Sequence, residues 1–332
     1  MRIDVSLLPK KLNEINYFKK GDNGCEIYSY SAKLEDRNEV IVVELKDCEI
    51  EKDFCIDLKS LEMVKVLYPC DITITDKSFI IKSNKGKYTG KLLSEGLFNL
   101  STSNYNDVLS IDIDTLVKAS GYVSKNDKKP ILCGVRIDEN GNVYATDSFR
   151  AYFYRESESL SQNGITIPTS FINLVKSLSN ENNIKINYNN NILVVMFNNI
   201  KIFGRLLDGN YPNMSKILER KNNATLIEID KDEICERLEI ASNIGNDSDK
   251  RTIIKFTNGK IEALGNNNYE AEIKFECDSE YSTKMQFDFL DQAFKTITND
   301  LKFKVVLDSI QKIGVMLFLE NEKETCLILG VK

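Results

Sequence analysis

Residues 130–152 read PILCGVRIDENGNVYATDSFRAY, and the segment GVRIDENGNVYATD inside this stretch points to the fold of the 332-residue chain. Apolar and polar residues alternate on both sides of Asn140-Gly141, as in strands that bury one face. Asn-Gly is a residue pair that favours a tight turn between two antiparallel strands. The segment therefore predicts a β-hairpin with its turn at Asn140-Gly141.

Helical patterns flank this hairpin and recur along the chain. Ile234, Leu238 and Ala241 follow one another at the i, i+4, i+7 spacing of a helix with one apolar stripe. Acidic residues precede the stripe, where they suit a helix N-terminus. The same arrangement predicts a first amphipathic helix in residues 3–18, 111–123 and 229–244.

A second helix and more alternating strands complete each repeat. Phe171, Leu174, Val175 and Leu178 give the second helix a face expected to be buried. This helix is predicted in residues 56–68, 167–179 and 287–299. The first two repeats close alike, with Gly90-Lys91-Leu92-Leu93 and Gly204-Arg205-Leu206-Leu207. We therefore predict three tandem α+β domains, at residues 1–103, 104–222 and 223–332.

Composition excludes several functional classes. The chain has no histidine, which removes Ser-His-Asp catalysis and imidazole metal sites, and it has no glycine-rich phosphate loop. We expect no cofactor and no metal. Eight cysteines without a CxxC spacing, and no signal-peptide pattern, predict reduced thiols in the cytoplasm. Charges interrupt every apolar run, so no membrane segment is expected. The net charge of −6 still allows the protein to bind DNA if its basic residues share one surface.

The central segment resembles a known family. Residues 130–152, followed by FGRLLDGNYPN at residues 203–213, resemble the central domain of the bacterial DNA polymerase III beta subunit, the replicative sliding clamp. The family carries Ala-Thr-Asp-Gly-His-Arg-Leu and then Leu-(Val/Ile)-Asp-Gly-x-(Phe/Tyr)-Pro in the same order and spacing. The threefold repeat extends the resemblance over the whole chain, although the first domain matches mainly through its architecture.

The resemblance implies the DNA clamp fold, in which each domain has two helices and antiparallel sheets. It further implies that two head-to-tail protomers form a six-domain ring around duplex DNA. The expected function is that of a non-catalytic processivity factor. Its expected partners are double-stranded DNA, the replicative polymerase, the clamp loader and a second copy of the chain.

A sliding ring must hold DNA by topology and attract phosphates without reading bases. Such a ring needs basic side chains on its inner helices. A single lysine on a helix usually marks only a solvated face. Basic residues recur after the first helix in all three repeats, however, and this recurrence favours a DNA-binding role for the set. The candidates are Lys10, Lys11, Lys19 and Lys20 in the first repeat, Lys118, Lys125, Lys128, Lys129 and Lys176 in the second, and Arg237, Lys250 and Arg251 in the third.

The resemblance also implies a pocket between the second and third domains. In the family this pocket binds short partner motifs, typically a glutamine followed by leucine and phenylalanine. The matching positions are Leu132, Thr146, Ser148, Phe149, Arg150, Ala151, Leu327, Leu329, Gly330, Val331 and Lys332. Ser148 and Phe149 replace the usual Gly-His and Ala151 a usual leucine, so the preferred partner is expected to differ. Core packing is the alternative role for the leucines, and a turn cap is the alternative for Thr146.

Repeat position predicts that the strand at Lys87-Tyr88 and the helix at Ile240-Ala241 meet in the dimer, with Tyr88, Ile240 and Ala241 at the interface. Two other functions are weighed beside the clamp. The altered pocket permits a diverged phage, plasmid or accessory clamp. The carboxylates Asp112, Asp114, Asp230, Asp232 and Glu233 permit a Mg²⁺-dependent hydrolase, although acidic residues at helix starts usually serve as caps.

Overall fold

The computed structural model describes residues 1–33, 38–46, 48–94, 107–126, 128–155, 164–189, 191–227, 231–245, 253–257, 260–264, 269–272, 282–297, 302–306 and 316–330. The chain divides into two compact units. One contains residues 1–114 and 170–207, and the other contains residues 115–169 and 208–332. Within the described residues, no helix combines the length and apolar character needed to cross a bilayer.

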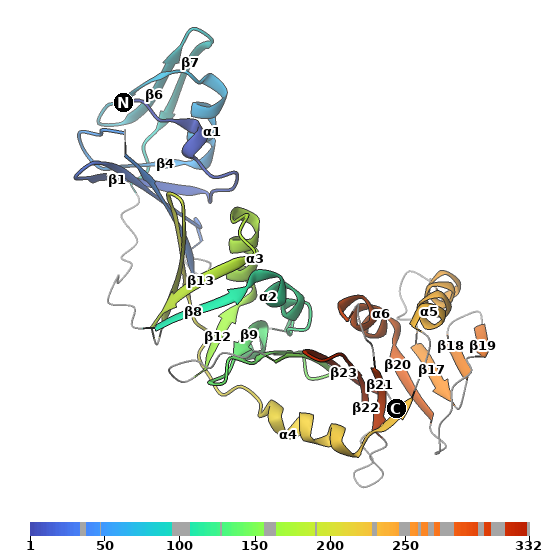
Figure 1. Cartoon of the computed structure of the whole chain (residues 1–332). Coiled ribbons are helices and arrows are strands. Elements are labelled where there is room, and N and C mark those ends of the chain that lie inside the picture. Colours follow the sequence, from blue (N-terminus) through green and yellow to red (C-terminus); the bar gives the residue numbers. More distant parts are fainter. Residues whose placement is uncertain are drawn as a thin grey trace. The chain divides into compact units, whose positions relative to one another are not determined.

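The first unit is built on an eight-stranded antiparallel sheet with the order β4-β1-β2-β3-β15-β14-β13-β8. Figure 1 labels β1, β4, β8 and β13 of this sheet. Its core contains buried apolar residues from strands far apart in sequence, such as Val42, Val194 and Phe203. The strands are β1 (Ile15–Gly21), β2 (Gly24–Tyr30), β3 (Glu39–Leu45), β4 (Phe54–Asp57), β8 (Asp107–Asp112), β13 (Asn183–Tyr188), β14 (Ile192–Phe197) and β15 (Ile200–Arg205).

A three-stranded sheet and two helices complete this unit. The sheet has the order β5-β6-β7, with strands β5 (Asp71–Ile74), β6 (Ser78–Ser83) and β7 (Gly86–Lys91). Helix α1 (Leu58–Leu67) begins where the Asp57 carboxylate accepts a hydrogen bond from the Ser60 amide at 2.8 Å. Helix α3 (Thr169–Leu178) buries Phe171 and Val175 as predicted, together with Ile172, whereas Leu174 and Leu178 of the predicted face are half-buried.

The second unit repeats the same plan. Its eight-stranded antiparallel sheet has the order β12-β9-β10-β11-β23-β22-β21-β16. The predicted hairpin is confirmed, because β9 pairs with β10 and Gly141 adopts φ +80° in the turn between them. The strands are β9 (Gly134–Ile137), β10 (Val143–Thr146), β11 (Arg150–Tyr154), β12 (Ile165–Pro168), β16 (Thr225–Ile227), β21 (Lys302–Val306), β22 (Met316–Glu320) and β23 (Glu324–Leu329).

A four-stranded sheet and several helices accompany it. The sheet has the order β19-β18-β17-β20, with β17 (Ile253–Thr257), β18 (Lys260–Leu264), β19 (Tyr269–Glu272) and β20 (Ser282–Gln286). The helices are α4 (Met214–Glu219), α5 (Lys231–Gly245), α6 (Phe287–Thr296) and the 3₁₀ helices η3 (Pro130–Cys133) and η4 (Arg220–Asn223). Helix α2 (Ile113–Ser120) begins at the last two residues of the first unit.

Strand order supports the predicted repeat. In each eight-stranded sheet, four strands of one predicted repeat lie beside four strands of the next, in equivalent order. The join is β3 with β15 in one sheet and β11 with β23 in the other. Gly90 and Gly204 occupy equivalent positions in the first two repeats, and neither site has room for a side chain. A Cβ added at Gly90 would lie 2.5 Å from Ser60 Oγ, and one added at Gly204 would lie 2.4 Å from the Phe171 ring. Each glycine therefore lets the second helix of its repeat approach the strand closely.

The predicted first helix is wrong in the first repeat and confirmed in the other two. Residues 3–18 contain only a 3₁₀ turn, η1 (Val5–Leu7), and β1 already begins at Ile15. Pro9 lacks an amide proton and disfavours helical backbone at Leu8, which ends the turn early. In its described residues the first repeat therefore has one α-helix instead of two, whereas α2 and α5 occupy the predicted positions in the second and third repeats.

Candidate functional site

The turn between β10 and β11 is held by its own side chains. Thr146 Oγ1 donates to the Arg150 carbonyl oxygen at 2.8 Å and accepts from the Ser148 amide at 3.1 Å. Asp147 Oδ1 accepts from the amides of Phe149 at 2.9 Å and of Arg150 at 3.0 Å. Ser148 has φ +80°, a left-handed conformation that costs energy in a residue with a side chain. The turn is therefore both strained and firmly fixed.

Strand β23 pairs with β11, and its last residue is hydrogen-bonded to this turn. Ala151 lies opposite Leu327 in the β11–β23 ladder, and the Leu329 amide donates to the Phe149 carbonyl oxygen at 2.8 Å. Ala151 and Leu327 are buried in one apolar cluster, and the half-buried Leu329 packs against it. The structure thus brings together the turn and the C-terminal strand that the sequence predicted to meet.

Helix α4 covers this cluster and was missed at the sequence level. Met214 is buried in the cluster, and Tyr211, Ile217 and Leu218 pack against it. Asn213 caps the helix, accepting from the Lys216 amide at 3.3 Å. The spacing of Met214, Ile217 and Leu218 at i, i+3, i+4, directly after the YPN of residues 211–213, was the available signal.

Arg150 points to the opposite face of the sheet. Its Nε lies 2.9 Å from Asp147 Oδ2, and its guanidinium also hydrogen-bonds to Gln292 of α6. It lies over the rings of Tyr122 at 5.3 Å and Phe289 at 4.4 Å. Only 11% of the Arg150 side chain is exposed. The predicted charge is therefore paired and holds the turn against α6, whereas its neighbour Phe149 is exposed and Ala151 is buried in the apolar cluster.

A second buried polar group on that face anchors β23. Glu324 accepts hydrogen bonds from Tyr152 at 2.8 Å, Lys118 at 2.9 Å and Asn321 at 3.1 Å. Burial alone would raise the pKa of Glu324, but these hydrogen bonds outweigh it, so the pKa is lowered. The carboxylate is therefore ionised in place and ties α2, β11 and β23 together.

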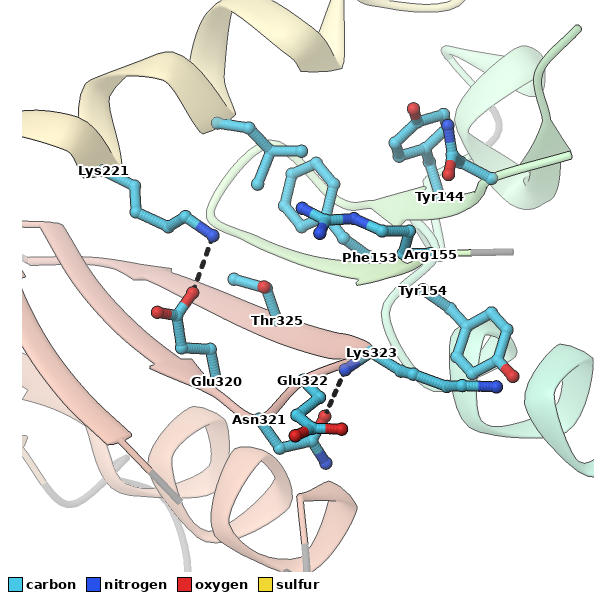
Figure 2. Close-up of a pocket in the computed structure, with 12 residues that line it drawn as sticks. Tyr144, Phe153, Tyr154, Arg155, Lys221, Glu320, Asn321, Glu322, Lys323 and Thr325 are labelled. Atoms are coloured by element: carbon cyan, nitrogen blue, oxygen red, sulfur yellow. Dashed lines mark hydrogen bonds and ion pairs between the residues drawn. The ribbon is translucent and has the colours of Figure 1, made fainter. Parts of the chain in front are cut away.

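A cavity of about 350 Å³ opens beside the same cluster (Figure 2). Tyr144, Phe153 and Leu218 contribute its apolar wall. The ion pair between Lys221 Nζ and Glu320 Oε2, at 2.7 Å, crosses from η4 to β22 at its edge (Figure 2). Among the described residues, none of those predicted for the pocket lines this cavity. The candidate peptide surface is therefore the one at Phe149 and Leu329, beside the buried Ala151.

The remaining predicted pocket residues divide into three groups. Leu132 is buried in η3 and accepts from the Ser124 amide through its carbonyl oxygen at 2.8 Å. It is not among the members of the apolar cluster that contains Leu327, and its burial suits core packing, the alternative role given for it. Gly330 follows β23 and is half-buried. Val331 and Lys332 lie outside the described residues.

The predicted basic residues occupy varied positions. Lys10 and Lys11 lie exposed between η1 and β1, and Lys19 and Lys20 lie within β1 instead of following a helix. Lys118 pairs with Glu324, Lys176 pairs with Asp114 at 2.6 Å, and Arg237 lies 3.9 Å from Glu233. Lys250 and Arg251 lie outside the described residues. Lys125, Lys128 and Lys129 lie exposed between α2 and η3.

The predicted interface residues lie on β7 and α5. Tyr88 is half-buried on β7, with its hydroxyl 3.1 Å from Ser60 Oγ. Ile240 is half-buried on α5, and Ala241 follows it on that helix. Two of the carboxylates considered for hydrolysis, Asp114 and Glu233, belong to the ion pairs given above. Asp230 lies outside the described residues.

Comparison with known proteins gives a consistent result. Residues 113–213 match the family described as DNA polymerase III beta subunit, central domain. A Beta sliding clamp of Staphylococcus aureus is 29% identical over 201 residues, which cover 56% of this chain and 53% of that protein. The matched stretch thus spans about half the length of the Staphylococcus relatives. A Beta sliding clamp of Mycoplasma capricolum is 24% identical over 315 residues, covering 87% of this chain and 77% of that protein.

Solved structures share the fold along nearly the whole chain. A putative DNA polymerase III beta subunit from Eubacterium rectale has a TM-score of 0.78 and 18% identity, over 96% of this chain and 91% of that chain. The DNA polymerase III subunit beta from Pseudomonas aeruginosa has a TM-score of 0.79 and 13% identity, over 96% and 93%. At these identities the likeness establishes the fold, and it confirms the expected mixed architecture of helices and antiparallel sheets.

Proposed function

We propose that this chain is a DNA sliding clamp of the bacterial DNA polymerase III beta subunit family: a non-catalytic processivity factor that encircles duplex DNA. The observation that carries the proposal is that strands of neighbouring repeats pair in the same way in both eight-stranded sheets. Strand β3 pairs with β15, and the equivalent β11 pairs with β23. A chain whose repeats join edge to edge in this way is suited to building a closed ring.

Ring closure follows from the strands at the two free edges. By position in the repeat, β19 corresponds to β3 and β11, and β7 corresponds to β15 and β23. In the described part of the chain, β19 pairs only with β18 and β7 pairs only with β6. A second copy placed head to tail would supply the missing neighbour for each edge, with Tyr88, Ile240 and Ala241 at the interface.

Duplex DNA is the expected occupant of the ring. Lys10, Lys11, Lys20, Lys125, Lys128 and Lys129 have exposed side chains that can neutralise phosphates without reading bases. Attraction of this kind is salt-sensitive and sequence-independent, as sliding requires. We assign the strongest role to Lys125, Lys128 and Lys129, because these three exposed side chains follow one another closely in the segment between α2 and η3.

The surface at Phe149 and Leu329, beside the buried Ala151, is the expected binding surface for partner peptides. We propose that the replicative polymerase, the clamp loader and other proteins bind there through short motifs with leucine and phenylalanine. The half-buried Leu329 and Ile217 leave apolar area that such side chains can cover. We further propose the three domains at residues 1–103, 104–222 and 223–332, and the cytoplasm as the site of action.

Two measurements test the proposal. Light scattering at micromolar concentration should give the mass of a dimer, and a stable monomer would contradict the ring. After loading, the protein should remain on closed circular DNA and leave once that DNA is linearised. Equal retention on circular and linear DNA would indicate ordinary groove binding instead of topological binding.

A further inference from the structure

Two cysteines of the first unit lie in contact with each other. Cys25 lies on β2 and Cys48 follows β3, and their side chains are buried, with 3% and 2% exposed. Both are free thiols, and the Cys25 thiol donates a hydrogen bond to the Cys48 sulfur. Thiols in mutual contact can be joined with little movement of the backbone.

The backbone around these cysteines fixes their contact. Cys25 lies opposite Leu45 in the β2–β3 ladder, close in sequence to Cys48. Gly24 has φ +136° and lets the start of β2 approach the end of β3 very closely. A Cβ at this position would collide with the carbonyl oxygens of Leu45 and Lys46. The approach of the two thiols is therefore a product of the strand pairing.

A cavity of about 840 Å³ gives small solutes access to one of the two sulfurs. Of the two cysteines, Cys48 is the one that lines it. The exposed residues Arg2, Lys82 and Asn84 also line the cavity, so it opens to solvent. The hydrogen bond from Cys25 lowers the pKa of Cys48 more than burial raises it, whereas the same bond and burial both raise the pKa of Cys25. Cys48 is therefore the thiol that meets an oxidant and that ionises first.

We propose that Cys25 and Cys48 form a redox-modification site, at which hydrogen peroxide closes a reversible disulfide. The Cys48 thiolate attacks one peroxide oxygen, the O–O bond breaks, and the departing hydroxide takes up the proton that Cys48 lost, which leaves a sulfenic acid and water. The Cys25 sulfur then attacks the Cys48 sulfur, the S–O bond breaks, and the hydroxyl leaves with the Cys25 proton as a second water. Two thiols are thus oxidised to one disulfide, and one peroxide is reduced to two waters. A dithiol reductant reverses the link by thiol–disulfide exchange.

The disulfide ties β2 to the segment that follows β3. Strand β3 also pairs with β15, so the link fastens the strand through which the first two repeats join. A covalent link between distant residues restricts the unfolded chain and thereby favours the folded unit. Amides of β2 and β3 should therefore exchange more slowly in the oxidised protein than in the reduced one.

The test treats the full chain with hydrogen peroxide and maps linked peptides by mass spectrometry. In wild type the Cys25–Cys48 link should be at least about tenfold more abundant than any other cysteine pair, because the two thiols are already in contact. Cys25→Ser should leave Cys48 as a sulfenic acid that dimedone traps, and Cys48→Ser should leave Cys25 unmodified. Cys70→Ser is the matched control. Cys70 lines the same cavity, but its thiol donates to the Val64 carbonyl oxygen at 3.9 Å, so its removal should not change the yield of the link.

The other possible results contradict the proposal. A link between Cys48 and Cys70, oxidation spread evenly over the cysteines, or no link at all in wild type would refute the paired site. Sulfenic acid on Cys25 in Cys48→Ser, with none on Cys48 in Cys25→Ser, would refute the role of Cys48 as the attacking thiol. The mapping on wild type needs no substitution, so it decides the outcome even if a serine variant folds poorly. In urea the preference for this pair should disappear, and a preference that persists there would show that the fold does not create it.

Discussion

Replacing Arg150 by alanine should destabilise the second unit far more than replacing Arg2 destabilises the first. Both residues form an ion pair through Nε at 2.9 Å, Arg150 with Asp147 and Arg2 with Asp71. They differ in burial. The side chains of the Arg150 pair are 11% and 15% exposed, and those of the Arg2 pair are 82% and 71% exposed. The comparison therefore sets a buried ion pair against an exposed one.

The expected magnitudes follow from that difference. Removing one partner of a buried ion pair costs about 3–5 kcal/mol, because the other charge remains buried without compensation. Arg150→Ala also removes the hydrogen bond to Gln292 and the contacts with Tyr122 and Phe289. An exposed pair contributes at most about 1 kcal/mol, since water and salt screen it. We expect about 3–5 kcal/mol for Arg150→Ala and at most about 1 kcal/mol for Arg2→Ala.

Hydrogen exchange of individual amides is the suitable assay, because a chain with two compact units need not unfold in one step. Amides of β11 and β23 should lose protection in Arg150→Ala, while those of β1 and β2 keep theirs. Urea unfolding followed by tyrosine fluorescence gives an independent midpoint for each variant. A loss of stability no greater than that of Arg2→Ala would refute the structural role assigned to Arg150.

Three further predictions concern DNA, peptides and pH. Changing Lys125, Lys128 and Lys129 together to glutamate should weaken retention on circular DNA and flatten its salt dependence, whereas unchanged retention would make them ordinary surface lysines. Deleting Leu329-Gly330-Val331-Lys332 should weaken a leucine-phenylalanine peptide by roughly a hundredfold, because each buried side chain contributes about 1.5–3 kcal/mol; equal titrations would place the surface elsewhere. Glu324 has a pKa below its usual 4.5 in the folded state, so its contribution is complete above that value and is lost as pH falls through the folded pKa. Urea midpoints of wild type and Glu324→Gln should therefore differ at pH 7 and converge in acid, and a constant difference would contradict this role.

Much of the fold could be predicted from local patterns. The Asn140-Gly141 turn and the apolar stripe at Phe171 and Val175 depend on neighbours in sequence, and both are confirmed. The first helix failed because apolar spacing alone ignored Pro9. The pairing of strands from different repeats could not be predicted from local patterns. Strands β11 and β23 are separated by more than half of the chain, and their pairing depends on the assembled core.

The candidate site was predictable in part for the same reason. Motif spacing identified the turn at Thr146 and the strand at Leu327, and the structure places them side by side. The direction of Arg150 was not predictable, because its partner Gln292 belongs to another repeat. Helix α4 was overlooked because its apolar residues acquire their role only when Met214 and Ile217 pack on strands of two repeats.

The strand pairing across repeats has a consequence for how the chain folds. The second repeat gives β13–β15 to one unit and β9–β12 to the other, so neither sheet is complete when that repeat stands alone. A fragment of residues 104–222 would expose the edges of β15 and β11, both of which are central strands in the whole chain. Such edges promote aggregation. The folding units are thus interleaved along the polypeptide, and a nascent chain must wait for distant strands before either sheet can close.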